Sequence, residues 1–96
     1  MIFVKISEIT GSFAENKDSA RSIRKEKIVP ALESKQEVCL DFEAVESTTQ
    51  SFIHALISEL IRDYGNDVLD RIVFKNCNET VQKIVNIVVD YMEESG

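Results

Sequence analysis

The sequence predicts an α/β domain with a small, largely parallel sheet of three to four strands and helices packed on it. Short β-branched and apolar segments alternate with longer amphipathic ones, in the order strand, helix, strand, helix, strand, helix. Strands joined through helices pair in parallel with right-handed crossovers. The chain of 96 residues has only 3 glycines and 1 proline, so most of it is expected in regular elements of a single domain over residues 1–96.

The first third of the chain predicts two strands and a helix. Residues 2–7 alternate apolar with other side chains, which is typical of a strand whose two faces differ. A turn at Thr10 and Gly11 leads into residues 12–14, a short second strand. Helix-starting residues cluster at 15–18, and apolar spacing predicts a helix from Ser19 to about Val29, where Pro30, which removes a backbone donor, is expected to kink or end it.

The middle of the chain predicts the central strand and the clearest helix. Residues 37–42 have the continuous apolar centre of a strand covered on both faces. Ser47 and Gln50 have the spacing of a capping box, and the helix that follows is expected to stop at Gly65. Its apolar residues form two adjacent rows with a spacing of four: Phe52, Ile53, Leu56, Ile57, Leu60, Ile61 and Tyr64.

The last third predicts a strand and a helix. Residues 71–74 form a short apolar strand after an acidic loop, and Asn76 and Glu79 have the spacing of an Asn-headed capping box. An apolar stripe between residues 81 and 92 marks the last helix. Ile87 and Val89 widen this stripe, which predicts a self-association surface and hence a homo-oligomer through the last helix.

Charge and cysteine usage exclude several classes of function. The chain has 17 acidic and 11 basic residues and a net charge of −6, which argues against nucleic acid or an anionic membrane as the main partner. Its 2 cysteines are too few for a disulfide scaffold and wrongly spaced for zinc. There is no basic leader and no apolar run near the about 18 residues of a membrane span, so a cytoplasmic protein is expected.

No combination of residues in the sequence indicates catalysis. His54 is the single histidine, it falls on the polar side of its helix, and no cluster has the spacing of metal ligands. No glycine-rich phosphate loop is present. Cys39 is expected in the core, and Cys77 is expected to be a passive thiol, although a helix N-terminus can stabilise a thiolate. We therefore expect a protein that is not an enzyme and has no cofactor or metal.

Two polar clusters remain as candidate binding surfaces. The first helix is locally basic, which suits an acidic partner or a phosphate as well as a plain solvated face; its cations are Arg21, Arg24, Lys25 and Lys27. Hydroxyl side chains gather before the next helix, where the helix dipole favours an added phosphate, although ordinary N-capping explains them more simply; they are Ser47, Thr48, Thr49 and Ser51.

The order of these segments resembles the STAS domains of anti-sigma-factor antagonists, and more closely an uncharacterised STAS-like family of bacterial and archaeal proteins. Residues 11–13 are similar to their second strand start, and residues 38–45 to their central strand with its Leu-Asp-apolar ending. Residues 74–76 and the helix after them are similar to the last strand and helix. The central strand followed by residues 49–52 is the most characteristic part.

The resemblance implies a regulatory module that docks on a protein partner, such as a histidine-kinase-like ATPase. Anti-sigma-factor antagonists begin this helix with Asp-Ser-Ser-Gly and are phosphorylated on the second serine, which falls on Ser51; Thr49, Gln50 and Phe52 replace the other three residues. Ser51 is thus the first candidate phosphoacceptor, and Thr49 and Thr48 are its neighbours. The expected partner-binding residues are Ser47, Thr48, Thr49, Gln50, Ser51 and His54.

Binding of a small ligand is a second class of function that the sequence leaves open beside docking on a protein. The domain would then bind a small ligand or nucleotide whose anionic group lies against a helix N-terminus, at residues 47–51 or 76–79. A nucleotide panel in a thermal-shift assay separates the two classes, because a ligand stabilises the fold that binds it.

Overall fold

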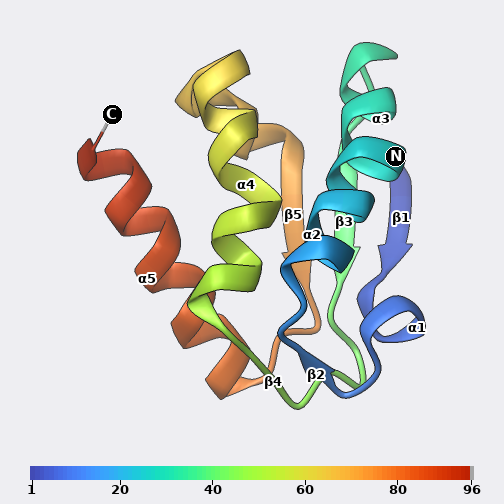
Figure 1. Ribbon diagram of the computed structural model, residues 1–96. Helices are drawn as coiled ribbons and strands as arrows, with labels where there is room; N and C mark the ends of the chain where they lie inside the picture. Colours follow the sequence, from blue (N-terminus) through green and yellow to red (C-terminus); the bar gives the residue numbers. More distant parts are fainter. Residues whose placement is uncertain (96) are drawn as a thin grey trace.

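The computed structural model describes the backbone of residues 1–95 and the side chains of residues 1–93 (Figure 1). Its main sheet consists of the parallel strands β1 (Ile2–Lys5), β3 (Val38–Asp41) and β5 (Ile72–Lys75), in the order β1-β3-β5. The prediction of a parallel sheet with its central strand inside residues 37–42 is therefore confirmed. Strand β5 begins at Ile72, one residue later than predicted.

A second, two-stranded parallel sheet lies at the lower end of the domain in Figure 1. It pairs β2 (Phe13–Ala14) with β4 (Ser47–Thr48), so residues 12–14 do contain the predicted second strand. The amide of Glu46 also donates to the carbonyl of Ser12 at 2.7 Å. This pairing holds the segment that precedes α2 (Lys17–Ile23) against the segment that precedes α4 (Gln50–Tyr64).

The first strand is shorter than the alternation at residues 2–7 predicts. It ends at Lys5, and the chain turns at once into the short helix α1 (Ile6–Thr10). Ile6 is fully buried in this helix instead of on the sheet. Gly11, with φ of 76°, ends the helix and donates its amide to the Ser7 carbonyl at 2.8 Å. Glycine suits this helix end, because a positive φ is costly for other residues.

Pro30 was expected to kink or end the first long helix near Val29, and the helix does not end there. Helix α2 (Lys17–Ile23) passes into a π-helical turn, η1 (Arg24–Ile28), and then into α3 (Val29–Glu33). In the π turn the Val29 amide donates to the carbonyl of Arg24, five residues back. Pro30 has no amide to give and its ring clashes with a regular α-helical turn, so the wider turn lets the chain stay helical. The helix also starts earlier than Ser19, because Asn16 caps its N-terminus.

The remaining elements follow the predicted order. Helix α4 (Gln50–Tyr64) stops at Gly65, as expected. The acidic loop after it is a 3-10 helix, η2 (Asn66–Arg71), which was not predicted. Helix α5 (Glu79–Ser95) closes the described chain. Within the part of the chain that the structure describes, no helix has the length and apolarity needed to cross a bilayer.

The helices α2, α4 and α5 lie side by side over one face of the main sheet, with α4 in the middle (Figure 1). The core fills the space between this layer and the sheet. Phe42 and Phe74 stack there with ring centroids 6.1 Å apart. The large fully buried side chains of the core include several from α4 and from the central strand and the residue after it: Leu40, Phe42, Phe52, Ile53, Leu56, Ile57 and Leu60.

The opposite face of the main sheet is only partly covered. Phe3, Cys39 and Val73 lie in one register row across the strands. Phe3 is 65% exposed and Val73 is 41% exposed, whereas Cys39 between them is buried, as predicted. The ammonium of Lys75 lies 5.9 Å from the centroid of the Phe3 ring. Charged and apolar residues thus share this face.

Candidate functional site

The hydroxyl cluster before α4 divides into three different environments. Thr48 lies in β4, where its buried hydroxyl donates to the Ala14 carbonyl at 2.7 Å. Thr49 is the N-cap of α4, and its Oγ1 accepts from the amide of Phe52 at 3.1 Å. Ser51 is exposed in the first turn of α4. Of these three candidate phosphoacceptors, Ser51 therefore has the hydroxyl that is free of a structural hydrogen bond and open to solvent.

The predicted capping box of Ser47 and Gln50 is wrong. Ser47 belongs to β4, and the cap is two residues later, at Thr49. The register differs because β4 pairs with β2 and keeps the chain extended as far as Thr48. A Thr N-cap satisfies one of the free amides of the first turn as a Ser would.

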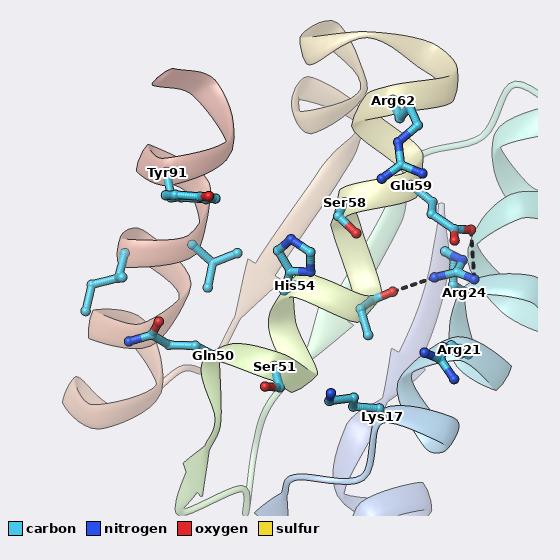
Figure 2. A pocket seen from close by; sticks show the side chains of 13 residues that line it. Lys17, Arg21, Arg24, Gln50, Ser51, His54, Ser58, Glu59, Arg62 and Tyr91 are labelled. Atoms are coloured by element: carbon cyan, nitrogen blue, oxygen red, sulfur yellow. Dashed lines mark hydrogen bonds and ion pairs between the residues drawn. The ribbon is translucent and has the colours of Figure 1, made fainter. Parts of the chain in front are cut away.

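The first turn of α4 opens into a groove of about 510 Å³ that runs along the outer side of α4, between α2 and α5 (Figure 2). Helix α4 forms its floor and the two neighbouring helices form its walls. We call this the α4 groove. Its lining residues are Lys17, Arg21, Arg24, Gln50, Ser51, His54, Ala55, Ser58, Glu59, Arg62, Ile87, Val88 and Tyr91.

The wall formed by α2 is basic. Lys17 and Arg21 are exposed one helical turn apart and face the start of α4 (Figure 2). Arg21 makes a weak pair with Asp18 at 3.3 Å, in which both side chains are more than half exposed. Pairs of this kind contribute little, because water screens them and two long side chains lose their freedom. Both cations therefore remain available to a binding partner.

Arg24, the third basic residue of this wall, is held in place by α4. Its side chain is 6% exposed, Nη1 donates to the Ala55 carbonyl at 2.7 Å, and Nη2 lies 3.0 Å from Oε2 of Glu59. Glu59 is half exposed. The carbonyl and the carboxylate together offset the loss of water around the guanidinium. Arg24, the first residue of η1, thereby ties the end of α2 to α4 and fixes the width of the groove at this point.

The floor of the groove is lined by small side chains of α4. Ser51, Ala55 and Ser58 follow one another at spacings of four and three residues, which places them in one row along the helix. Ser58 is buried although its sequence position is on the polar side of the helix. His54 is exposed and stands beside this row, as expected (Figure 2). Small side chains let another backbone come close to the axis of α4.

The wall formed by α5 is mostly apolar. Ile87 is 43% exposed and Tyr91, one turn further on, is 62% exposed. Val88 behind them is buried. Val89, which was predicted to widen an exposed stripe, is only partly exposed and packs against the core. The exposed apolar surface of the last helix therefore consists of Ile87 and Tyr91, which face the groove.

The groove is electropositive in a protein that is acidic as a whole. Four Lys or Arg side chains and one carboxylate line it, whereas the net charge of the chain is −6. Figure 2 shows Lys17 and Arg21 near one end of the groove and Arg62 near the other. The first turn of α4 adds the positive end of the helix dipole beside Ser51. A cleft with these charges attracts anionic groups.

At the second predicted anion site, residues 76–79, the side chains of Asn76 and Asn78 are engaged in hydrogen bonds within the protein. Asn78, and not Asn76, caps α5, because Asn78 Oδ1 accepts from the amide of Val81 at 2.8 Å. Asn76, at a φ of 59°, donates to the Asp41 carboxylate at 2.9 Å. This hydrogen bond is the main reason why the pKa of Asp41 lies below its ordinary value, and the Glu43 amide and two lysines add to it.

Cys77 lies between these two asparagines, and its half-buried side chain is not activated. Burial raises the pKa of the Cys77 thiol, and the nearby carboxylate of Asp41 raises it further. Both effects disfavour the thiolate, which is the reactive form of a cysteine. A passive thiol is what the sequence led us to expect. Among the described residues, no group of three or more His, Cys, Asp or Glu side chains is placed to hold a metal ion.

The structure brings part of the predicted site together and separates the rest. Gln50, Ser51 and His54 line the groove, whereas residues 47–49 lie outside it. The basic cluster of the first helix divides too: Arg21 and Arg24 face the groove, and Lys25 and Lys27 are exposed away from it. Sequence reasoning missed seven lining residues as site residues: Lys17, Ala55, Ser58, Glu59, Arg62, Val88 and Tyr91.

One signal in the sequence was sufficient to find the basic wall. Lys17, Arg21 and Arg24 have helical spacings of four and three, so they share one face of the continuous helical segment of α2 and η1 once it begins at Lys17. Starting the helix at Ser19 excluded Lys17 from that face. No comparable pattern in the sequence predicts that Tyr91 of α5 lies in the same groove.

Comparison with known proteins identifies the family. A family model described as a STAS-like domain of unknown function (DUF4325) matches residues 19–82, more than half of the chain. The chain belongs to this STAS-like family. The resemblance inferred from the sequence is therefore confirmed. No curated protein and no solved structure gave a significant match.

The region shared with the STAS-like family covers most of the α4 groove. It includes Arg21, Arg24 and the whole floor formed by α4, and it ends just after the start of α5. Lys17 and Tyr91 lie outside the matched region. The description of the STAS-like family assigns no function, so the function has to be argued from the site.

Proposed function

We propose that this STAS-like protein is a non-catalytic regulatory module of the cytoplasm that docks on a protein partner through the α4 groove. The observation that carries the proposal is the groove itself, an open basic and apolar channel on an acidic protein. It contains Gln50, Ser51 and His54, which the sequence marked as partner-binding residues. One wall carries Arg21 and the other carries Tyr91, and arginine and aromatic residues are both enriched at protein interfaces.

Ser51 is the proposed switch of this docking surface. Its hydroxyl is exposed at the N-terminus of α4, and Lys17 faces it from α2 (Figure 2). Phosphorylation adds about −1.5 to −2 charges and three acceptor oxygens at neutral pH. Such a group would pair with the cations of the groove and the dipole of α4, and would change what else can bind there. Phe52, which replaces a glycine of the anti-sigma-factor antagonists, is fully buried and leaves Ser51 accessible.

A histidine-kinase-like ATPase is the proposed partner, on the basis of the resemblance to anti-sigma-factor antagonists. A kinase of this kind both binds the domain and supplies the phosphate. Residues 47–49 would form the edge of such an interface, because β4 leads directly into the groove.

The test is affinity capture of the tagged protein from its native lysate with and without ATP. Ser51→Glu should weaken capture of the partner, whereas Ser34→Glu, which adds the same charge at an exposed position outside the groove, should leave it unchanged. Intact-mass analysis of the bait then detects a phosphate. If Ser51→Glu and Ser34→Glu capture the same partner equally well, the α4 groove is not the docking surface.

A small anionic ligand, such as a nucleotide, is the second candidate, because Lys17 and Arg21 stand beside the first turn of α4. A ligand at about 100 times its dissociation constant adds about 2.7 kcal/mol to the stability of the fold. A nucleotide panel that raises the melting temperature of the wild type but not of Lys17→Glu would favour this reading over protein docking.

Self-association through α5 is a separate proposal. It now depends on Ile87 and Tyr91, because Val89 packs against the core. Sedimentation equilibrium should show a dimer that Tyr91→Glu dissociates. A protein that sediments as a monomer at high concentration would exclude this proposal.

A further inference from the structure

We propose that the α4 groove binds an amphipathic helix of the partner that carries carboxylates along one side and apolar side chains along the other. This inference rests on the proposed docking function and specifies the chemistry of the segment that docks. Three features of the groove lead to it: a basic wall, an apolar wall and a floor of small residues, all aligned with α4.

The basic wall selects acidic side chains. Lys17 and Arg21 are exposed, and the partner of Arg21 is a solvent-exposed aspartate of its own helix. Arg24 is already paired with Glu59 and contributes no free charge. Arg62 adds a cation toward the other end of the groove. Because the chain as a whole carries −6, an acidic segment is repelled elsewhere and attracted here.

The apolar wall favours a segment that carries apolar side chains in addition to acidic ones. Ile87 and Tyr91 expose 43% and 62% of their surface, and they stand on the side of the groove opposite Lys17 and Arg21. A purely anionic ligand leaves these side chains in water. A ligand with apolar groups on the flank next to α5 buries them, and burial of aromatic side chains dominates the energetics of interfaces.

The spacing of both walls matches a helix. Lys17 and Arg21 are four residues apart on α2, and Ile87 and Tyr91 are four residues apart on α5. Each pair is therefore separated by about 6 Å along its helix axis, slightly more than one helical turn. A helix lying along α4 presents its own residues i and i+4 at the same interval, with acids on one flank and apolar residues on the next.

The floor of the groove accommodates the backbone of such a helix. Ser51, Ala55 and Ser58 form a row of small side chains between the two walls. The lining of α4 from Ser51 to Arg62 extends over about 16 Å, which is the length of about three helical turns. A docked helix of this length can contact both walls and the floor at the same time.

The test uses synthetic peptides as probes of the intact protein. A capped 14-residue helical peptide carries Glu at i, i+4 spacing on one flank and Leu at i, i+4 spacing on the adjacent flank. A second peptide has the same composition in scrambled order, and a third has Lys in place of each Glu. Each is titrated into the 15N-labelled protein, and amide shifts give the affinity and the location of binding.

The acidic amphipathic peptide should shift the amides of Arg21, Ser51, Ala55 and Tyr91, and should bind at least fivefold more tightly than the scrambled and Lys peptides. Lys17→Glu combined with Arg21→Glu should weaken it at least twofold, because each exposed ion pair changes an affinity about 1.4- to 5-fold. Lys25→Glu, in the π-helical turn η1 that follows α2 and outside the groove, is the control and should have no effect. Tyr91→Ala should weaken the peptide without changing its salt dependence.

Three results would overturn this inference: equal binding of the Glu and Lys peptides, shifts confined to the sheet face around Phe3 and Val73, or no shifts at millimolar peptide. Inorganic phosphate that shifts Lys17 and Ser51 while the peptide leaves Tyr91 unshifted would assign the basic wall to a phosphate ligand instead. A photo-crosslinker at His54 separates this failure from failure of the docking function. A partner captured there from native lysate, beside a peptide that does not bind, leaves docking intact and rejects only the acidic helix.

Discussion

Removing the carboxylate of Glu59 is expected to destabilise the protein more than removing the guanidinium that it neutralises. The Arg24 side chain is 6% exposed and has two partners, the Ala55 carbonyl at 2.7 Å and Glu59 at 3.0 Å. Glu59→Ala leaves a buried positive charge with one neutral acceptor. Breaking a buried pair in this way costs about 3–5 kcal/mol, and because Glu59 is half exposed we expect about 2–3 kcal/mol.

Arg24→Met removes the buried charge and leaves the carboxylate of Glu59 without its partner. The carboxylate of Glu59 can turn into water, because half of its side chain is already exposed. The Met side chain fills the apolar part of the space left by the arginine stem. Replacing a buried ion by a well-packed apolar side chain is often close to neutral, so we expect a loss below about 1 kcal/mol.

Urea unfolding followed by far-UV circular dichroism measures both free energies of unfolding. Arg21→Met is the control, because the pair of Arg21 with Asp18 is exposed and its loss should change stability by less than about 0.5 kcal/mol. The double variant Arg24→Met with Glu59→Ala should be about as stable as Arg24→Met alone. The reasoning is refuted if Arg24→Met costs more than Glu59→Ala, or if Glu59→Ala is as stable as the wild type.

Three further predictions concern the loops around the sheets. Ala44 has a φ of 68°, so Ala44→Gly should stabilise the protein by up to about 1 kcal/mol in urea unfolding, whereas Lys83→Gly in α5 should cost about 1 kcal/mol; a loss at both sites would contradict this. The pKa of Asp41 lies below its ordinary value because Asn76 donates to it, so its contribution to stability is present above about pH 4 and is lost as the pH falls through the folded pKa. Asn76→Ala should therefore raise the pKa of Asp41, seen by NMR titration, and reduce this loss; an unchanged pKa would show that Asn76 is not its cause. Thr48→Val removes a buried hydrogen bond to β2 and should cost about 1 kcal/mol, and unchanged stability would show that this bond contributes nothing.

The fold was largely predictable because its elements are marked by local patterns. The central strand is continuously apolar, and the rows of α4 repeat at helical spacing and end at Gly65, so each element could be assigned without its neighbours. The errors occurred where two local rules compete. Pro30 opposes a regular helix, but its effect depends on whether the preceding turn can widen, as it does at Arg24–Ile28. Ser47 and Thr49 are both good N-caps, and pairing with a distant strand decides between them.

The site was less predictable than the fold because three helices build it. Ser51 was found through the hydroxyl cluster before α4 and the resemblance to anti-sigma-factor antagonists, and His54 was placed on the polar side of the same helix. Lys17 was missed through a two-residue error in the start of α2, which removed it from the basic face. Tyr91 comes from α5, and only the packing of α5 against α4 brings it to the same groove. Charges that converge from separate elements leave no pattern in a single segment.

Docking through the α4 groove is tested most directly by a photo-crosslinking amino acid, p-benzoylphenylalanine, placed at two positions in turn. His54 is exposed in the groove, and Val73 is exposed on the opposite face of the sheet. Irradiation in native lysate should give a crosslinked partner with the probe at His54 and none with the probe at Val73. A partner captured at Val73 and absent at His54 would contradict the account and move the interface to the open face of the sheet.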